Sequence, residues 1–239
     1  MADEWRKWQI EMSGKISKKD EEGWSVEKNV RFVGGADVST DGIKTVVGIC
    51  VFSFPELKLL KEIVKEFPAS EIPYIPGYLG MREAPAVLAV LDQLKEEEEE
   101  WLKDTGFTSE FVLLVDGNGV LHERRFGSAC HIGLLGDVIT IGVAKTFYCV
   151  PGVNLSRHEA NQIFKRTEEE GETVKLLADE LEAAAVRTSL NASTPVFVSV
   201  GNRISLESAV EIVKKTSKYR VPEPIRRADF ISRAFLKQI

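Results

Sequence analysis

Three consecutive segments near the start of the chain carry the residue pattern of β-strands. They are Phe32–Val38, Lys44–Phe54, which is rich in Val, Ile and Phe, and Leu57–Phe67, in which apolar and charged residues alternate. Only a few residues separate each segment from the next. Because short connections are typical of antiparallel neighbours, the pattern predicts a three-stranded antiparallel meander.

Three later strands are predicted by short apolar runs, Phe111–Val115, Val138–Val143 and Pro195–Val200. Such runs are typical of strands that are buried on both faces of a sheet. A helix is predicted from near Glu83 onwards, and another after Ser205, which has the side chain of an N-cap. A meander followed by strands that alternate with helices predicts an α/β fold, with a mixed sheet flanked by helices.

The remaining segments favour helix. Residues 1–29 are predicted to form a peripheral helix and a loop, because Trp5, Trp8 and Met12 recur at roughly helical spacing before a polar run. Residues 154–192 are polar and also favour helix, with the acidic cluster at 168–172 as a loop or insertion. A chain of 239 residues with 44% apolar side chains suffices for one substantial core. We therefore expect a single main domain at residues 30–239.

Composition limits where the protein works. The longest apolar stretches fall far short of the roughly 20 residues that a membrane span needs, so no membrane partner is expected. The three cysteines, Cys50, Cys130 and Cys149, are widely spaced among apolar neighbours. This predicts buried reduced thiols and a cytoplasmic or nuclear address. We expect a monomer.

Charge is distributed unevenly along the chain. The net charge of −6 argues against a surface that attracts polyanions everywhere. Residues 201–239, however, hold nine Lys or Arg against four Asp or Glu. This asymmetry is compatible with a basic face for a nucleic acid, and equally with an ordinary solvated pair of helices.

Three carboxylates stand at the ends of predicted elements. Asp37 and Asp116 lie at or near the ends of apolar strands, and Glu83 lies at a helix start. An ionised carboxylate is costly to bury unless it is paired, hydrogen-bonded or bound to a cation. If the first two strands are neighbours, their carboxylates would converge on a hard cation such as Mg²⁺, which orients water and polarises a phosphodiester. Singly, each carboxylate is more often a turn-former or a surface charge, so spacing alone leaves both interpretations open.

Seven short motifs occur in order over most of the chain. They are Val33–Ser39, Pro73–Leu79, Met81–Pro85, Val115–His122, Arg125–His131, Ile141–Lys145 and Tyr219–Pro224. Together they resemble the motifs of the endonuclease V family, and the fourth and fifth are closest to the animal members. The resemblance implies a ribonuclease H-like fold and a Mg²⁺ ion, with Mn²⁺ accepted in its place, held by Asp37, Glu83 and Asp116.

The same resemblance implies a region that recognises a base. An aromatic ring in a Pro-rich turn would act as a wedge, filling the gap that a base leaves in the stack, while glycine-rich backbone would read the edge of hypoxanthine. The alternative for the turn is simple packing of an aromatic ring on the core. The residues that match are Pro73, Tyr74 and Ile75 for the wedge, and Gly77, Leu79 and Gly127 for the base pocket.

Two basic side chains, Lys145 and His122, match family positions near the scissile phosphate. Lys145 would hold a phosphate oxygen or lower the pKa of a water, and His122 would position substrate near the scissile bond. Arg124 and Arg125 would neutralise phosphates. The alternatives are a solvated strand-end lysine, a structural histidine and plain surface charge.

One position departs from the family pattern. The family usually has a Gly-His-Arg string after its last strand, and here the string is Gly201-Asn202-Arg203. An amide offers only its oxygen as an acceptor, which Mg²⁺ tolerates. Asn202 is therefore a possible further metal ligand by this resemblance, with a changed metal preference.

The resemblance implies an endonuclease that hydrolyses the second phosphodiester on the 3′ side of inosine and leaves 5′-phosphate ends. The expected partner is inosine-containing single-stranded RNA, with deoxyinosine in DNA left open. Two alternatives remain. One is a binding module for inosine-containing RNA with weak or no cleavage, motivated by Asn202, and the other is a nuclease on the same fold that reads nucleic-acid structure rather than the base.

Overall fold

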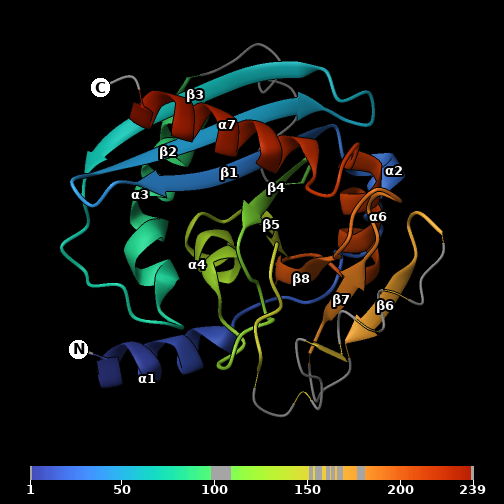
Figure 1. The fold of residues 1–239 in the computed structure, drawn as a ribbon, viewed down its shortest axis with the longest axis horizontal. Helices are drawn as coiled ribbons and strands as arrows, with labels where there is room; N and C mark the ends of the chain where they lie inside the picture. The colour runs from blue at the N-terminus through green and yellow to red at the C-terminus, as the bar shows by residue number, and fades with distance from the viewer. Residues whose placement is uncertain are drawn as a thin grey trace.

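Among the residues that the structure describes, eight strands form one mixed sheet at the centre of the computed structural model (Figure 1). These residues are 2–97, 109–150, 153, 158–159, 162, 165, 169–176 and 181–237. The strands are β1 (Phe32–Thr40), β2 (Lys44–Ser53), β3 (Leu59–Pro68), β4 (Phe111–Asp116), β5 (Ile139–Ala144), β6 (Thr173–Leu176), β7 (Ala183–Val186) and β8 (Val196–Asn202). The helices are α1 (Ala2–Ser13), α2 (Val26–Asn29), α3 (Leu79–Glu96), α4 (Ser128–Leu135), α6 (Leu206–Thr216) and α7 (Glu223–Lys237).

The sheet order is β3-β2-β1-β4-β5-β8-β7-β6, and its first half confirms the predicted meander. β1 pairs antiparallel with β2, which pairs antiparallel with β3. β4 lies parallel to β1, with Ala36 opposite Val115, and β5 lies parallel to β4. The strands that carry Asp37 and Asp116 are therefore neighbours, and both carboxylates lie at the same edge of the sheet.

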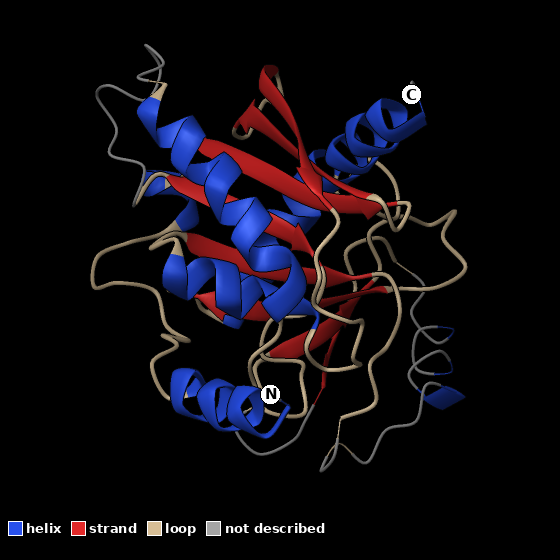
Figure 2. Ribbon diagram, turned by 90° about the vertical axis from the view of Figure 1, so that its left-hand side faces the viewer, coloured by secondary structure: helices blue, strands red, loops and turns tan. Residues whose placement is uncertain are grey.

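Helices cover both faces of the sheet (Figures 1 and 2), which confirms the predicted α/β class. Successive strand residues point to opposite faces, so one strand can contribute to two cores. Ala36 packs in a buried cluster with Val87 of α3, whereas Val33 belongs to a cluster with Ile225 and Ala228 of α7. The sheet thus lies between α3 with α4 on one face and α6 with α7 on the other.

Helix α7 lies across β1 and β2 (Figure 1), and two glycines allow it to come very close. A Cβ at Gly35 would lie 2.1 Å from the carbonyl carbon of Pro224. At Gly48 it would lie 2.7 Å from the carbonyl oxygen of Ala228. Side chains at both positions would therefore push α7 away from the sheet. The close approach places the middle of α7 beside the carboxyl end of β1.

The prediction for residues 154–192 was wrong at two places. Instead of helix, 173–176 and 183–186 form β6 and β7, which extend the sheet beyond β8. β7 has the sequence Ala-Ala-Ala-Val, whose intrinsic preference is largely helical, but all four residues are buried in the sheet. Tertiary pairing overrides local propensity here. Much of the rest of this segment, including Glu168 of the acidic cluster, lies outside the described residues.

Smaller differences concern element ends and one thiol. α3 begins at Leu79 rather than near Glu83, so Glu83 lies in its second turn. The helix predicted after Ser205 is confirmed, since the Ser205 hydroxyl caps α6 by accepting from the Ser208 amide at 3.1 Å. Cys50 and Cys130 are buried free thiols, but Cys149 is exposed, contrary to the prediction.

The N-terminal segment makes specific contacts with the body of the protein. The Ser17 amide donates to the Asn202 side chain at 3.2 Å, and the Asp20 carboxylate accepts from Ser205 and Ser208. The division of the chain at residue 30 stays a prediction. No helix in the described part of the chain combines the length and apolar character needed to cross a bilayer.

Candidate functional site

Three carboxylates converge where β1, β4 and α7 meet. Oxygen atoms of Asp37, Asp116 and Asp229 all lie within 4.8 Å of one another. Asp37 is only 7% exposed, and its Oδ2 accepts a hydrogen bond of 2.7 Å from the hydroxyl of Ser232 on α7. Parallel pairing of β1 with β4 brings in the first two groups, and the close approach of α7 brings in the third.

Glu83 faces the same cavity from α3. The cavity is lined by Asp37, Glu83 and Asp116 together, so the structure brings together the three carboxylates that the sequence singled out. Burial, with the charges of Asp37 and Asp116, raises the pKa of Glu83 to about 8, against the opposing effect of Arg82. Burial also raises the pKa of Asp37 to about 6, where Asp116 and Asp229 add to the effect and the Ser232 hydrogen bond opposes it. Full ionisation of this cluster is unfavourable without a cation.

Lys145 supplies a positive charge at the edge of the cluster. It follows β5 directly, and its Nζ lies 2.6 Å from Asp116 Oδ2 and 3.6 Å from Asp229 Oδ1. Although burial acts to lower the pKa of this ammonium group, the neighbouring carboxylates raise it above its usual range. The side chain is 35% exposed, so it can reach a ligand that approaches from solvent.

Asp229 and Ser232 were missed by sequence reasoning. Asp229 lies four residues after Ile225 and three before Ser232, both of which are buried on the sheet-facing side of α7. Residues at these spacings share one face of a helix. A carboxylate on the apolar stripe of an amphipathic helix was therefore a signal available in the sequence, but it needed the helix boundaries to be read first.

A second cavity, of about 170 Å³, adjoins the acidic cavity. The two share Leu79 and Ser128 as lining residues. Helices α3 and α4 both begin at the wall of this cavity. The first N–H groups of a helix have no hydrogen-bond partner within the helix itself. Much of the lining is glycine-rich backbone. The predicted residues Tyr74, Gly77, Leu79 and Gly127 all line this cavity, together with Gln9, Gly80, Gly117, Asn118, His122, Ser128 and Tyr148.

Tyr74 projects at the rim, where it is 66% exposed. Its neighbour Pro73 is exposed and Ile75 is half-buried. The Ile75 carbonyl accepts from the Tyr78 amide at 3.0 Å, which closes the turn just before α3. An exposed aromatic ring on a short turn is available to a ligand rather than to the core, which argues against the packing alternative.

His122 lies in the second cavity and not at the acidic cluster. It is 5% exposed and stacks on Tyr148, with ring centroids 5.8 Å apart. Its Nδ1 accepts from the Arg124 amide, so the proton lies on Nε2, which donates to the Gly77 carbonyl at 3.0 Å. Burial and the charge of Arg124 lower the pKa of His122 to about 4. The ring is neutral near pH 7 and supports the pocket wall.

The structure does not place Arg124 where a phosphate could reach it. Its side chain is 9% exposed, pairs with Glu123 and donates to the Gly77 carbonyl at 2.7 Å. The guanidinium also lies over the ring of Tyr78, 4.2 Å from its centroid. Arg125 has a positive φ of 55° and donates to the His122 carbonyl at 3.2 Å. Both arginines therefore brace the loop that carries His122.

The suggestion that Asn202 binds the metal was wrong. Asn202 pairs with Thr140 at the start of β5, whereas Asp116 pairs with Val143 near the end of that strand. Asn202 thus lies at the opposite end of the sheet from the carboxylates. Its amide is 4% exposed and already bonded, because its Oδ1 accepts from the Ser17 amide and its Nδ2 donates to the Gly133 carbonyl.

A mixed sheet with clustered carboxylates at the ends of its central strands defines a ribonuclease H-like α/β domain. In agreement, A. aeolicus Argonaute aligns with 94% of this chain and 30% of its own at a TM-score of 0.51, with 14% identity, a likeness of fold alone. The model of the family described as Endonuclease V matches residues 10–230. This chain belongs to the endonuclease V family.

Its relatives include proteins from animals and bacteria. Human endonuclease V is 34% identical to this chain, and the match covers 98% of this chain and 83% of the human protein. Endonuclease V of Dictyoglomus turgidum is 37% identical, and the match covers 96% of this chain and 89% of that protein. The catalytic domain of human endonuclease V superposes with a TM-score of 0.88 over 99% of this chain and 96% of its own. A structure of Ciona intestinalis endonuclease V, in complex with a 24mer DNA containing an inosine followed by a ribo-adenosine, also superposes with a TM-score of 0.88. Its sequence is 35% identical, and the superposition covers 99% of this chain and 98% of that chain. The structures of two animal members thus superpose closely on almost the whole of this chain.

Proposed function

We propose that this chain is a divalent-metal-dependent endonuclease that recognises inosine and hydrolyses the second phosphodiester on its 3′ side. The observation that carries the proposal is the adjacency of two cavities through Leu79 and Ser128, one lined by carboxylates and the other by glycine-rich backbone. A base held in the second cavity would leave the strand that follows it running towards the first.

The acidic cavity fits a hard divalent cation. Its donors are carboxylate oxygens, which Mg²⁺ prefers, and a bound cation would offset the burial and the neighbouring negative charge that raise the pKa values of Asp37 and Glu83. We propose Asp37, Asp116 and Asp229 as ligands, with Glu83 facing the same ion, and expect Mn²⁺ to be accepted. A bound ion would supply an activated water and stabilise the charge that develops on the phosphate and leaving oxygen.

The protein's own residues would position the substrate. Lys145 would hold a phosphate oxygen, because its ammonium group lies at the cluster and remains partly exposed. Tyr74 would stack in the gap left by the base, which contributes roughly 1–3 kcal/mol. The N–H groups at the starts of α3 and α4 carry partial positive charge and suit the carbonyl oxygen of hypoxanthine, where adenine has an amine.

We favour single-stranded RNA as the main substrate. The chain resembles animal members, and the Ciona intestinalis protein was captured with a ribo-adenosine after the inosine. DNA that contains deoxyinosine is a second candidate substrate. The products would be 3′-hydroxyl and 5′-phosphate ends, and the protein would act in the cytoplasm or nucleus as a monomer.

The reason for considering a binding module that does not cleave no longer applies. That alternative rested on Asn202 as a weakened metal ligand, but this amide lies away from the carboxylates and holds the N-terminal segment instead. The carboxylates that would support cleavage lie together around one cavity.

The test is a cleavage assay on four matched oligonucleotides, RNA and DNA, each with either inosine or adenosine at one position. We expect cutting of the inosine strands with Mg²⁺ and none with EDTA. Retention of inosine RNA without any product would favour the binding module. Equal cutting of inosine and adenosine strands would favour a nuclease that reads structure and not the base.

A further inference from the structure

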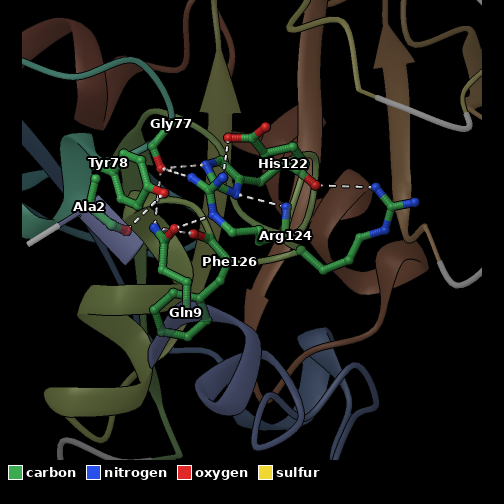
Figure 3. Close-up of polar contacts among 9 residues, drawn as sticks. Ala2, Gln9, Gly77, Tyr78, His122, Arg124 and Phe126 are labelled. Atoms are coloured by element: carbon green, nitrogen blue, oxygen red, sulfur yellow. Dashed lines mark hydrogen bonds and ion pairs between the residues drawn. The ribbon is translucent and has the colours of Figure 1, made fainter. Parts of the chain in front are cut away.

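The carbonyl oxygen of Gly77 is the meeting point of three hydrogen-bond donors (Figure 3). It accepts from Arg124 Nη2 at 2.7 Å, His122 Nε2 at 3.0 Å and Gln9 Nε2 at 3.2 Å. Gly77 has a φ of +80°, a conformation that favours glycine, and it ends the turn that carries Tyr74. Three donors on one oxygen hold this turn in a single position relative to the pocket.

Gln9 connects this wall of the pocket to the opposite one. Its Nε2 also donates to the carbonyl of Phe126, 3.3 Å away and next to Gly127, which lines the other side. Its Oε1 accepts from Arg124 Nε. Figure 3 shows this amide between the Gly77 and Phe126 carbonyls and the guanidinium of Arg124. Both donors and the acceptor of the Gln9 side chain are thus in use, and the residue is 1% exposed.

The rest of α1 holds Gln9 in place against the same two segments. Trp8 packs edge-on against Phe126, with ring centroids 5.4 Å apart, and Trp5 lies 5.7 Å from the ring of Tyr78. The Tyr78 hydroxyl donates to the Ala2 carbonyl at 3.3 Å. The N-terminal helix α1, which the sequence predicted to be peripheral, is therefore packed on the segments around Tyr78 and Phe126. These segments form opposite walls of the second cavity, which is called the base pocket from here on.

We propose that Gln9 is a positioning residue that sets the width of the base pocket and thereby its selectivity for inosine. The inference rests on the proposed function and deepens it. Gln9 lies at the pocket and away from the acidic cavity, so it acts on which base is admitted and not on the bond-breaking step. Without the amide of Gln9, the Gly77 and Phe126 walls of the pocket lose the side chain that joins them. The pocket then excludes less well a base whose hydrogen-bonding edge differs from that of hypoxanthine.

Two substitutions at Gln9 separate the effect of the hydrogen bonds of its amide from the effect of its side-chain volume. Gln9→Met fills a similar space but offers no donor, so both carbonyls lose a partner. Gln9→Glu keeps an acceptor for Arg124 but brings carboxylate oxygens against two carbonyl oxygens. The matched control is Glu11→Gln on the same helix, since the Glu11 side chain is 68% exposed.

The experiment measures kcat and KM separately on inosine, guanosine and adenosine strands, with thermal unfolding as a check on folding. Both Gln9 variants lose the hydrogen bonds to the two pocket walls, so they should lower the inosine preference in kcat/KM by on the order of tenfold. The loss should appear mainly as a raised KM for inosine strands, with kcat little changed. Glu11→Gln should match the unmodified protein.

A strand with an abasic site at the recognised position supplies a second control. Because no base enters the pocket, the unmodified protein and the Gln9 variants should bind it equally. If Gln9→Met cuts too slowly to score, faster hydrogen exchange at the Tyr78 amide would still show release of the turn. An unchanged inosine preference in both Gln9 variants, or a loss confined to kcat, overturns the proposal. A lack of inosine preference in the unmodified protein would instead refute the proposed function, and this inference with it.

Discussion

The two adjoining cavities are built in opposite ways. The acidic cavity has three carboxylates in its lining, from β1, α3 and β4, and Asp229 of α7 lies close to two of them. The base pocket is lined by four glycines, Gly77, Gly80, Gly117 and Gly127, and by uncharged side chains that include the neutral His122. The first cavity concentrates charge, whereas the second offers directed hydrogen-bonding groups of the main chain.

The difference determines how each cavity responds to mutation. A carboxylate that holds a cation can be removed by one substitution at its own position. A backbone donor cannot be removed in this way, so the main-chain part of the base pocket is altered through residues that support it, such as Gln9 and Arg124. We therefore expect direct, large effects in the acidic cavity and smaller, indirect effects in the pocket.

The largest effect is expected for Asp116→Asn. This substitution keeps the shape of the side chain but removes a charge from the three converging carboxylates. Cleavage should fall by about 10³-fold, because stabilisation of the developing charge is lost, while binding of an inosine strand changes only severalfold. Single-turnover rates and a binding titration in EDTA measure the two quantities. Asp92→Asn, at a carboxylate that is 65% exposed on α3, is the control. Full activity of Asp116→Asn would refute the metal assignment.

The second-largest effect is expected in the way the stability of the metal-free protein depends on pH. Between about pH 4 and 6.5 buried carboxyl groups and buried histidines have opposite effects on stability, since the raised pKa values of Asp37 and Glu83 make folding less favourable as pH rises. Burial lowers the pKa of His122 and His131 to about 4, which makes folding more favourable over the same range. Above about pH 7.5 these two histidines are almost wholly neutral in both the folded and the unfolded state, and native Glu83 still loses its proton.

In that upper window the free energy of unfolding should fall by at most about 1.4 kcal/mol per pH unit, because the unfolded carboxyl is already ionised. Urea unfolding in EDTA at several pH values measures the slope. Glu83→Gln should flatten it, and saturating Mg²⁺ should reverse it. An equal slope in Glu83→Gln would show that the fall has another source.

The smallest of these effects is expected for Tyr74→Ala. Removing an exposed ring from the rim of the base pocket should weaken binding of an inosine strand by roughly tenfold, since stacking on an aromatic side chain contributes about 1–3 kcal/mol per base. Dissociation constants in EDTA measure this without cleavage. Tyr74→Phe keeps the ring and should bind like the unmodified protein. An unchanged dissociation constant for Tyr74→Ala would remove the wedge from the proposed mechanism.

The sheet was predictable where local pattern and tertiary environment agree. The meander at residues 32–68 and the apolar strands β4, β5 and β8 were predicted because their patterns suit buried strands. β7 was missed because Ala183–Val186 carries a helix-favouring sequence, and its strand conformation depends on pairing with β8. A contact between distant segments decided that element, and no local window contains it.

The same contrast holds for the site. Asp37, Glu83 and Asp116 were predictable as carboxylates at element ends, but Asp229 enters only through the packing of α7 on Gly35 and Gly48. Gln9 could not be predicted either, because its partners are main-chain atoms of Gly77 and Phe126, 68 and 117 residues away.

The two cavities also depend differently on the docking of α7. The hydrogen bond between Ser232 and Asp37 joins positions 195 residues apart, so the acidic cluster is completed by one of the longest-range contacts in the chain. The base pocket draws its lining from residues 9 to 148 and needs none of α7. A molecule whose last helix is loose would therefore keep the lining of the base pocket but lack the Asp229 carboxylate of the acidic cluster.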